Sequence, residues 1–148
     1  MNTATRLLVI AIAWPLAASA QTDSARAYGA SFDHAAACIA ALRPYAAELA
    51  DRYRAGDESV SRELVALTES SLAIVGVAIQ EGLRKDEADM LLSSAEEFQR
   101  SVPASKLVAL VTACRAEGTA ILAEASPEDR ARMTATARAR ISRIRTDG

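Results

Sequence analysis

The sequence predicts an all-α fold, an antiparallel helical bundle of four to five helices. Ala, Leu, Arg and Glu, which are strong helix formers, are abundant in this chain of 148 residues. Apolar residues recur at spacings of three and four, which is the period of an amphipathic helix. The breaks between these stretches are short, so each helix is expected to return beside the one before it.

Residues 1–20 have the three zones of a secretory signal peptide. Arg6 supplies the positive charge, Leu7–Ala13 the apolar stretch and Ala18–Ala20 the small-residue cleavage site. The apolar stretch is about half of the roughly 20 residues that cross a membrane, and no later stretch is expected to cross one. We therefore expect cleavage after Ala20, a single helical-bundle domain over 21–148, and a periplasmic or secreted location.

The exported part contains two cysteines, Cys38 and Cys114. Exported proteins usually meet an oxidising compartment, so these residues are predicted to form a disulfide between the first and fourth helices. Closing so long a loop would stabilise the fold by about 4 kcal/mol through the unfolded chain. The alternative is a pair of buried free thiols.

A first helix is predicted from about Ser24 to Arg54. Pro44 lies inside its apolar stripe, which favours a kinked helix or two helices that meet near Arg43. Gly56 is expected near the end of this helix, with Asp57 or Ser59 as the cap of the next. The stripe consists of Tyr28, Ala35, Cys38, Leu42, Tyr45 and Leu49.

A second helix is predicted from about Glu58 to Leu83, with a turn at Lys85–Asp86 after it. Residues 72–79 are apolar on every side, which is typical of a helix surrounded by others, although a buried β-strand is an alternative for these eight residues. We expect this helix at the centre of the bundle. Its inward positions are Val60, Leu64, Leu67, Ile74, Val75, Ala78 and Ile79.

Three further helices are expected. The third opens at Asp86, stops at Ser101–Pro103, and should bury Met90, Leu91, Ala95 and Phe98. The fourth starts near Pro103 or Ser105. The fifth, basic and amphipathic, spans about 127–145, with Ser126 as its N-cap and Pro127 at its first position. The inward positions of the fourth helix are Leu107, Leu110, Val111, Cys114, Ile121 and Leu122.

The sequence offers little catalytic chemistry. His34, the only histidine, precedes Cys38 by one helical turn, but a zinc site needs a fourth ligand and a different cysteine spacing. No nucleophile elbow, phosphate loop or dinucleotide motif is present in the sequence. We therefore expect a protein that is not an enzyme and has no metal, no cofactor and no catalytic residue.

Charge is distributed unevenly along the chain. Residues 21–129 contain ten Lys and Arg against eighteen Asp and Glu, whereas residues 130–148 contain six Arg against one Asp. The basic helix is expected either to pack on the acidic body or to bind an acidic partner or, weakly, an anionic membrane surface. Nucleic acid is not expected, because no aromatic residues are interleaved for stacking. The candidate interaction surface is Arg130, Arg132, Arg138, Arg140, Arg143 and Arg145.

These features favour an exported, soluble, non-enzymatic protein of the bacterial cell envelope that acts through protein–protein binding. Chaperone-like, secretion-associated and inhibitor or immunity roles all fit, with a protein partner of unknown identity. The alternative is a carrier of a small ligand or lipid, with a cavity between helices near the small residues Ala73, Gly76 and Ala109–Ala113.

Overall fold

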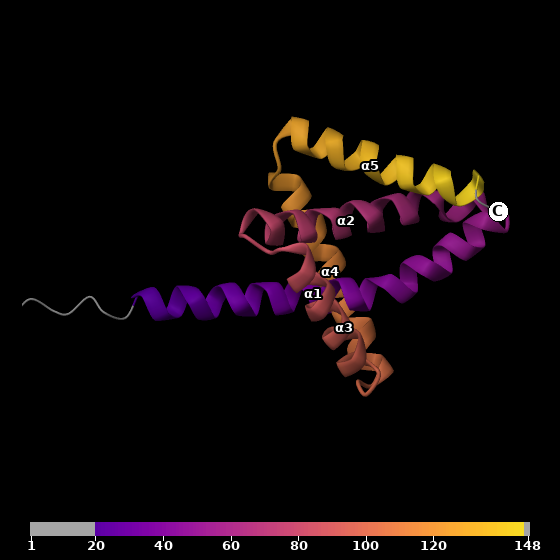
Figure 1. Ribbon diagram of the computed structural model, residues 1–148. Helices are drawn as coiled ribbons and strands as arrows, with labels where there is room; N and C mark the ends of the chain where they lie inside the picture. Colours follow the sequence, from indigo (N-terminus) through magenta and orange to yellow (C-terminus); the bar gives the residue numbers. More distant parts are fainter. Residues whose placement is uncertain (1–19, 147–148) are drawn as a thin grey trace, which may run out of the picture.

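The computed structural model describes the backbone of residues 20–146 and the side chains of residues 32–145. This part is all helical, as predicted, and contains no strand (Figure 1). The expected signal peptide, residues 1–20, lies outside the described residues except for Ala20, and so does the side chain of Tyr28. The elements are α1 (Ala20–Arg54), the 3-10 helix η1 (Glu58–Val60), α2 (Ser61–Gln80), α3 (Lys85–Gln99), α4 (Ala104–Glu124) and α5 (Pro127–Thr146).

Helix α1 is one long, bent helix. Its ribbon changes direction part of the way along (Figure 1), and Pro44 lies inside it. Proline has no N–H for the carbonyl of Ala40 and its ring crowds that oxygen, so a bend is expected here. The kinked single helix is therefore correct, rather than two helices meeting near Arg43. The chain leaves α1 through Gly56, whose φ is +97°, and the Asp57 side chain then caps η1 by accepting from the Ser59 N–H.

Helix α2 is the central element, as predicted. It packs against α1, α4 and α5, and the alternative of a strand at residues 72–79 is wrong. The prediction that Ile79 faces inward is also wrong, because 59% of it is exposed. Three neighbours leave one side of the last turn of α2 to solvent. The residues of η1 and α2 that are fully buried are Val60, Leu64, Leu67, Ser70, Ala73, Ile74 and Ala78.

One segment meets the length and hydropathy of a membrane-crossing helix, contrary to the expectation from the sequence. It is Glu58–Gln80, in which a window of 18 residues has a mean hydropathy of 1.4 and is 33% buried, and it is the only such segment among the described residues. The core helix of a bundle meets the same criteria. The contacts of α2 with three other helices agree with a core helix rather than with a membrane-crossing one.

Helices α2 and α4 cross (Figure 1), and Gly118 of α4 lies in close contact with Ser70 of α2. A Cβ atom added to Gly118 would lie 2.6 Å from the Ser70 Cβ and 2.7 Å from the Ser70 carbonyl oxygen. Only glycine fits this crossing, and the buried Ser70 is its counterpart on α2. Neither residue was singled out by the sequence.

Gly118→Ala should therefore destabilise the protein by about 1–3 kcal/mol, since overpacking outweighs the gain in helix propensity. Gly76→Ala is the matched control, because it is also inside a helix but has no atom within 4 Å of an added Cβ. It should stabilise the fold by about 1 kcal/mol. Urea denaturation measures both, and equal shifts for the two variants would contradict the close crossing.

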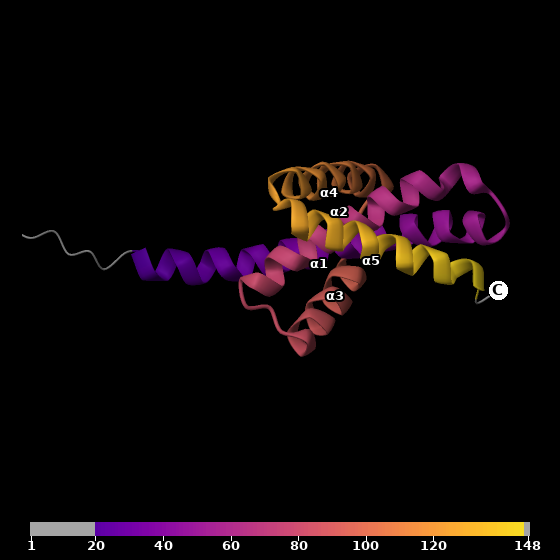
Figure 2. The ribbon, with the colours of Figure 1, turned by 90° about the horizontal axis from the view of Figure 1, so that it is seen from above.

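Helix α3 is peripheral, and the predictions for it were partly wrong. Its main neighbour is α1, and in the view from above it projects away from the other helices (Figure 2). Met90 and Phe98, predicted to be buried, are 67% and 70% exposed, because one neighbour covers only one side of a helix. The turn before α3 lies at residues 81–84 rather than at Lys85–Asp86, because Gly82, with φ +108°, follows the end of α2.

Helix α5 begins where the sequence predicts and packs on the body. Ser126 Oγ accepts a hydrogen bond of 3.1 Å from the Asp129 N–H, and Pro127 occupies the first helical position. The helix lies beside α2 and runs back toward the α1–α2 connection (Figures 1 and 2). Ala137 and Ile141 are its buried residues.

The disulfide between Cys38 and Cys114 is present, so the prediction of a link between the first and fourth helices is confirmed. The two Cα atoms are 5.4 Å apart, and both residues are fully buried. The bridge fixes α4 against α1 inside the apolar core. A disulfide of this kind is typical of proteins that reside in an oxidising compartment.

Removal of the bridge should destabilise the protein by about 4 kcal/mol, because the unfolded chain loses a constraint on a loop of 76 residues. Cys38→Ala/Cys114→Ala in urea denaturation measures this loss. Reduction of the wild type by a dithiol should reproduce most of it without deleting any buried sulfur. An unchanged midpoint in both cases would contradict a stabilising role for the disulfide.

Candidate functional site

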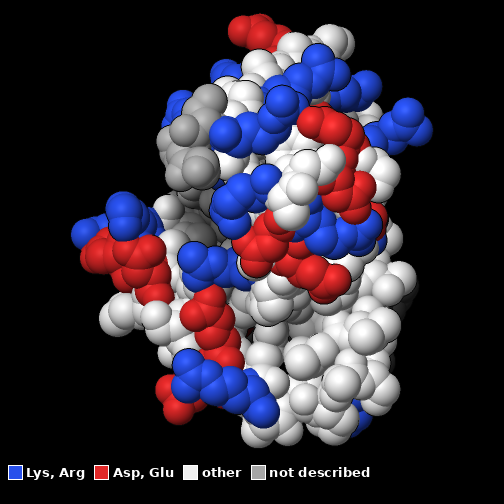
Figure 3. Space-filling view, turned by 90° about the vertical axis from the view of Figure 1, so that its right-hand side faces the viewer, with Lys and Arg blue, Asp and Glu red and all other residues white. Residues whose placement is uncertain are grey.

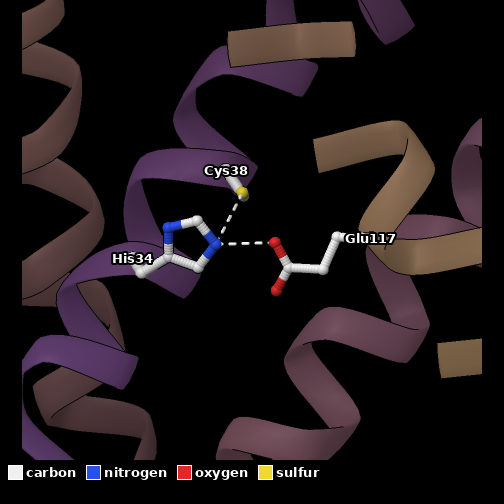
Figure 4. A group of neighbouring side chains, drawn as sticks. All are labelled: His34, Cys38 and Glu117. Atoms are coloured by element: carbon white, nitrogen blue, oxygen red, sulfur yellow. Dashed lines mark hydrogen bonds and ion pairs between the residues drawn. The ribbon is translucent and has the colours of Figure 1, made fainter. Parts of the chain in front are cut away.

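Four polar residues meet where α1 and α4 touch, and we call them the histidine cluster: His34, Cys38, Cys114 and Glu117. His34 Nε2 lies 2.6 Å from Glu117 Oε2 and 3.7 Å from Cys38 Sγ, so the ring points at both neighbours (Figure 4). The side chains of His34 and Glu117 are 50% and 40% exposed, whereas both sulfurs are buried. The cluster therefore opens to solvent on its His–Glu side only.

Glu117 is the member of the cluster that sequence analysis missed. It follows Cys114 by three residues, as His34 precedes Cys38 by four, and both spacings place side chains on one face of a helix. Once the disulfide joins the two faces, the outer pair must meet as well. The predicted bridge therefore contained the signal for Glu117. His34 and Glu117 form an ion pair or hydrogen bond between α1 and α4. In the disulfide form neither sulfur of the cluster is a thiolate.

A second polar contact joins α1, α2 and α4. The Tyr45 hydroxyl donates to Glu63, Arg115 Nη1 lies 3.2 Å from the same carboxylate, and the guanidinium carbon of Arg115 is 5.5 Å from the Tyr45 ring centroid. The hydrogen bond from Tyr45 lowers the pKa of Glu63, the charge of Arg115 lowers it further, and partial burial opposes them. The same hydrogen bond raises the pKa of Tyr45.

Tyr45→Phe should raise the pKa of Glu63 toward its ordinary value of 4.5. Since the folded state holds this pKa low, Glu63 stabilises the protein above pH 4.5 and loses that contribution as pH falls through the folded value. The variant should therefore lose less stability on acidification. NMR titration of the Glu63 carboxyl measures its pKa, and urea denaturation at neutral and acidic pH measures the stability of each protein. Tyr53→Phe, which leaves Glu63 untouched, is the control, and equal acid sensitivity of all three proteins would contradict the coupling.

The described part contains a groove of about 880 Å³ that we call the main groove. It lies where the bent part of α1 passes α2, the end of α3 and the last turns of α5. A volume of this size is within the range of ligand sites, about 300–1,000 Å³. Its walls are mostly aliphatic and come from all five α-helices, with Leu107 as the one residue of α4. Its aliphatic residues include Ile39, Ala46, Leu64, Leu72, Val75, Ile141 and Ile144.

Three arginines stand at the polar border of the main groove. Arg43 Nη1 is 2.6 Å from Glu96 Oε1, so its charge is compensated. The side chains of Arg100 and Arg140 are exposed and have no hydrogen-bond or ion-pair partner among the described residues. The groove thus combines an apolar lining with two uncompensated positive charges.

A second groove of about 730 Å³ adjoins the main groove on α2 and α5. The two share Leu72, Val75 and Arg140 as lining residues. Ala73 and Gly76, proposed from the sequence as places where small residues leave room, line this second groove. Ala109–Ala113 lines neither groove, and Ala109 and Ala113 are exposed on α4.

The arginines of the basic helix have different surroundings. The Arg130 guanidinium donates to the carbonyls of Leu122, Ala123 and Ala125 and so satisfies the end of α4. Arg132 pairs with Asp129, and Arg145 Nη1 is 2.7 Å from Glu58 Oε1.

The remaining arginines of α5 are exposed. Arg138 and Arg140 have no partner within the described part of the chain, and Arg143 lies near the end of the helix. On the face that carries the α1–α2 connection, basic and acidic side chains alternate over the upper part, and the lower right is largely uncharged (Figure 3). The six arginines therefore do not form one uncompensated patch.

Comparison with protein-family models, with curated proteins and with solved structures finds no match to the chain. The candidate sites therefore come from the structure alone. They are the main groove with Arg100 and Arg140, and the histidine cluster.

Proposed function

We propose that this chain is an exported, non-enzymatic binding protein of the bacterial periplasm or cell surface, and that the main groove carries an amphipathic anion. The ligand class is an aliphatic chain with one acidic group, such as a fatty acid. This proposal favours a carrier role over the protein–protein binding that the sequence alone favours. The signal-like N-terminus and the disulfide support the export that it assumes.

The observation that carries the proposal is the combination of an aliphatic groove of about 880 Å³ with two uncompensated arginines. Burial of an alkyl chain contributes about 0.8 kcal/mol per methylene group, so the lining supplies most of the affinity. A carboxylate at the border would gain charge-assisted hydrogen bonds from Arg100 or Arg140. Neither arginine would have to give up an existing partner.

The positions of the two arginines are the reason why we expect one end of the ligand to be acidic. Arg100 terminates α3 and Arg140 lies on α5, so their charges reach the groove from two elements. Arg140 also lines the second groove, which extends the apolar surface along α2. A chain longer than the main groove would therefore pass Arg140 and continue over Gly76.

The test is displacement of the fluorescent anion 8-anilinonaphthalene-1-sulfonate by dodecanoate. Wild-type protein should bind dodecanoate more tightly than the neutral analogue 1-dodecanol. Arg100→Gln/Arg140→Gln should weaken dodecanoate by about tenfold, which is the loss of one charge-assisted hydrogen bond, and leave dodecanol unchanged. Higher salt should reduce the preference for the anion.

The matched control is Arg62→Gln/Arg138→Gln, which removes two exposed arginines that line neither groove. It should bind dodecanoate like the wild type. If both double variants lose affinity equally, the anion responds to net charge and the groove is not its site. If the wild type binds neither compound, the carrier function is wrong.

A protein partner is the second candidate, and exposed apolar side chains favour it. Met90 and Phe98 on α3 and Val108 on α4 are each about two-thirds exposed, and most other exposed residues of α4 are small and uncharged. Native mass spectrometry of the protein purified from its own envelope extract separates the two functions. A retained small anion supports the carrier, and a stoichiometric protein in its place supports the interaction protein.

A further inference from the structure

The histidine cluster carries an inference that is independent of the groove. Each of two helices presents a pair of metal-ligating side chains on one face: His34 with Cys38 on α1, and Cys114 with Glu117 on α4. The ligand atoms of His34, Cys38 and Glu117 all lie within 4.8 Å of one another, and Cys114 is bonded to Cys38. Four ligands of suitable type therefore converge on one point.

We propose that reduction of the Cys38–Cys114 disulfide converts the histidine cluster into a zinc site with two thiolates, one imidazole and one carboxylate. This donor set suits Zn²⁺, which takes four ligands from Cys, His and acidic residues in tetrahedral geometry. Paired ligands on facing helices are also the way in which helical bundles build metal sites.

The spacing of the cluster is close to what zinc requires. Ligands bonded at about 2.0–2.3 Å to a tetrahedral ion stand about 3.3–3.8 Å apart. His34 Nε2 and Cys38 Sγ are already 3.7 Å apart. The two sulfurs must separate and the His34–Glu117 contact of 2.6 Å must lengthen, which side-chain rotations provide once the bridge is broken.

The chemistry balances with a dithiol as the reductant. Transfer of two electrons and two protons from the dithiol gives the Cys38 and Cys114 thiols and leaves the reductant as its own disulfide. Zinc then binds both sulfurs as thiolates and releases the two protons. A disulfide oxidant that accepts two electrons and takes up two protons to become two thiols would re-form the bridge and expel the ion, so the disulfide and the metal exclude each other.

Exposure of the cluster provides a route for the ion. The half-exposed side chains of His34 and Glu117 are the first ligands that an ion from solvent meets, and the buried sulfurs lie behind them (Figure 4). Once zinc is bound, it would again link α1 to α4. The reduced chain would thus keep the connection that the disulfide otherwise supplies.

The test uses Co²⁺ as a spectroscopic substitute for zinc. The purified protein is reduced with a dithiol, freed of reductant under argon and titrated with Co²⁺. The reduced protein should bind one ion per chain, with thiolate-to-cobalt charge transfer and the strong visible bands of tetrahedral cobalt, and one equivalent of Zn²⁺ should remove both. The oxidised protein should show neither.

Variants test whether His34 and Glu117 bind the ion together with the two cysteines, or whether the thiols alone bind it. His34→Ala and Glu117→Gln should each weaken cobalt binding by about 10–100-fold or more, the loss known for residues that only support a ligand. Glu124→Gln, two turns further along α4, is the matched control and should bind like the wild type. If His34→Ala and Glu117→Gln also bind like the wild type, or if reduction does not enhance binding, the proposal is wrong.

If the reduced chain loses structure, circular dichroism provides a second readout, the recovery of helical content on addition of zinc. Zinc should then restore helical content to the wild type and to Glu124→Gln, and less effectively to the His34 and Glu117 variants. Equal recovery in all four proteins, or no recovery in any, would overturn the proposal.

Discussion

The Cys38–Cys114 bridge is the constraint on which the arrangement of helices depends. It fixes α4 against α1 at a buried point, while Gly118, one turn after Cys114, allows α4 to approach Ser70 of α2. Three helices are thereby held at one place by one covalent bond and one close crossing. The chain has few aromatic side chains to fill a core, so these two contacts contribute to fixing the helices where other bundles use aromatic packing.

The periphery follows from this centre. Because α3 packs mainly on α1, and α5 mainly on α2, neither covers the bend of α1 completely. The main groove is the space that remains where the bend carries α1 past α2, and its aliphatic lining is the exposed part of the core. Pro44, which bends the helix, itself lines this space. A sequence feature that usually interrupts a helix therefore helps to create the main groove.

The elements that sequence reasoning predicted correctly are those decided by local chemistry: the Ser126–Pro127 start, the Asp57 cap, the kink at Pro44 and the cysteine pair. The errors concern how many neighbours a helix has. Phe98 and Ile79 lie on apolar stripes, yet periodicity says only which residues share a face, and a face without a neighbour stays exposed. Tyr53 was missed for the converse reason, since α5 returns to cover it. Main-groove residues such as Leu64 and Ile144 come from distant helices, so no local pattern assembles them.

The two proposed sites differ in their dependence on the disulfide. The histidine cluster uses the contact of α1 with α4, whereas the main groove is bounded by α1, α2, α3 and α5, with Leu107 as the contribution from α4. They share no residue. Reduction changes the first site directly and affects the second only if α4 leaves α2, a movement that the close fit of Gly118 on Ser70 opposes. A ligand in the groove and an ion in the cluster could therefore be bound by one and the same chain. The redox state of the cysteines would act directly on the ion, and on the groove only through the stability of the fold.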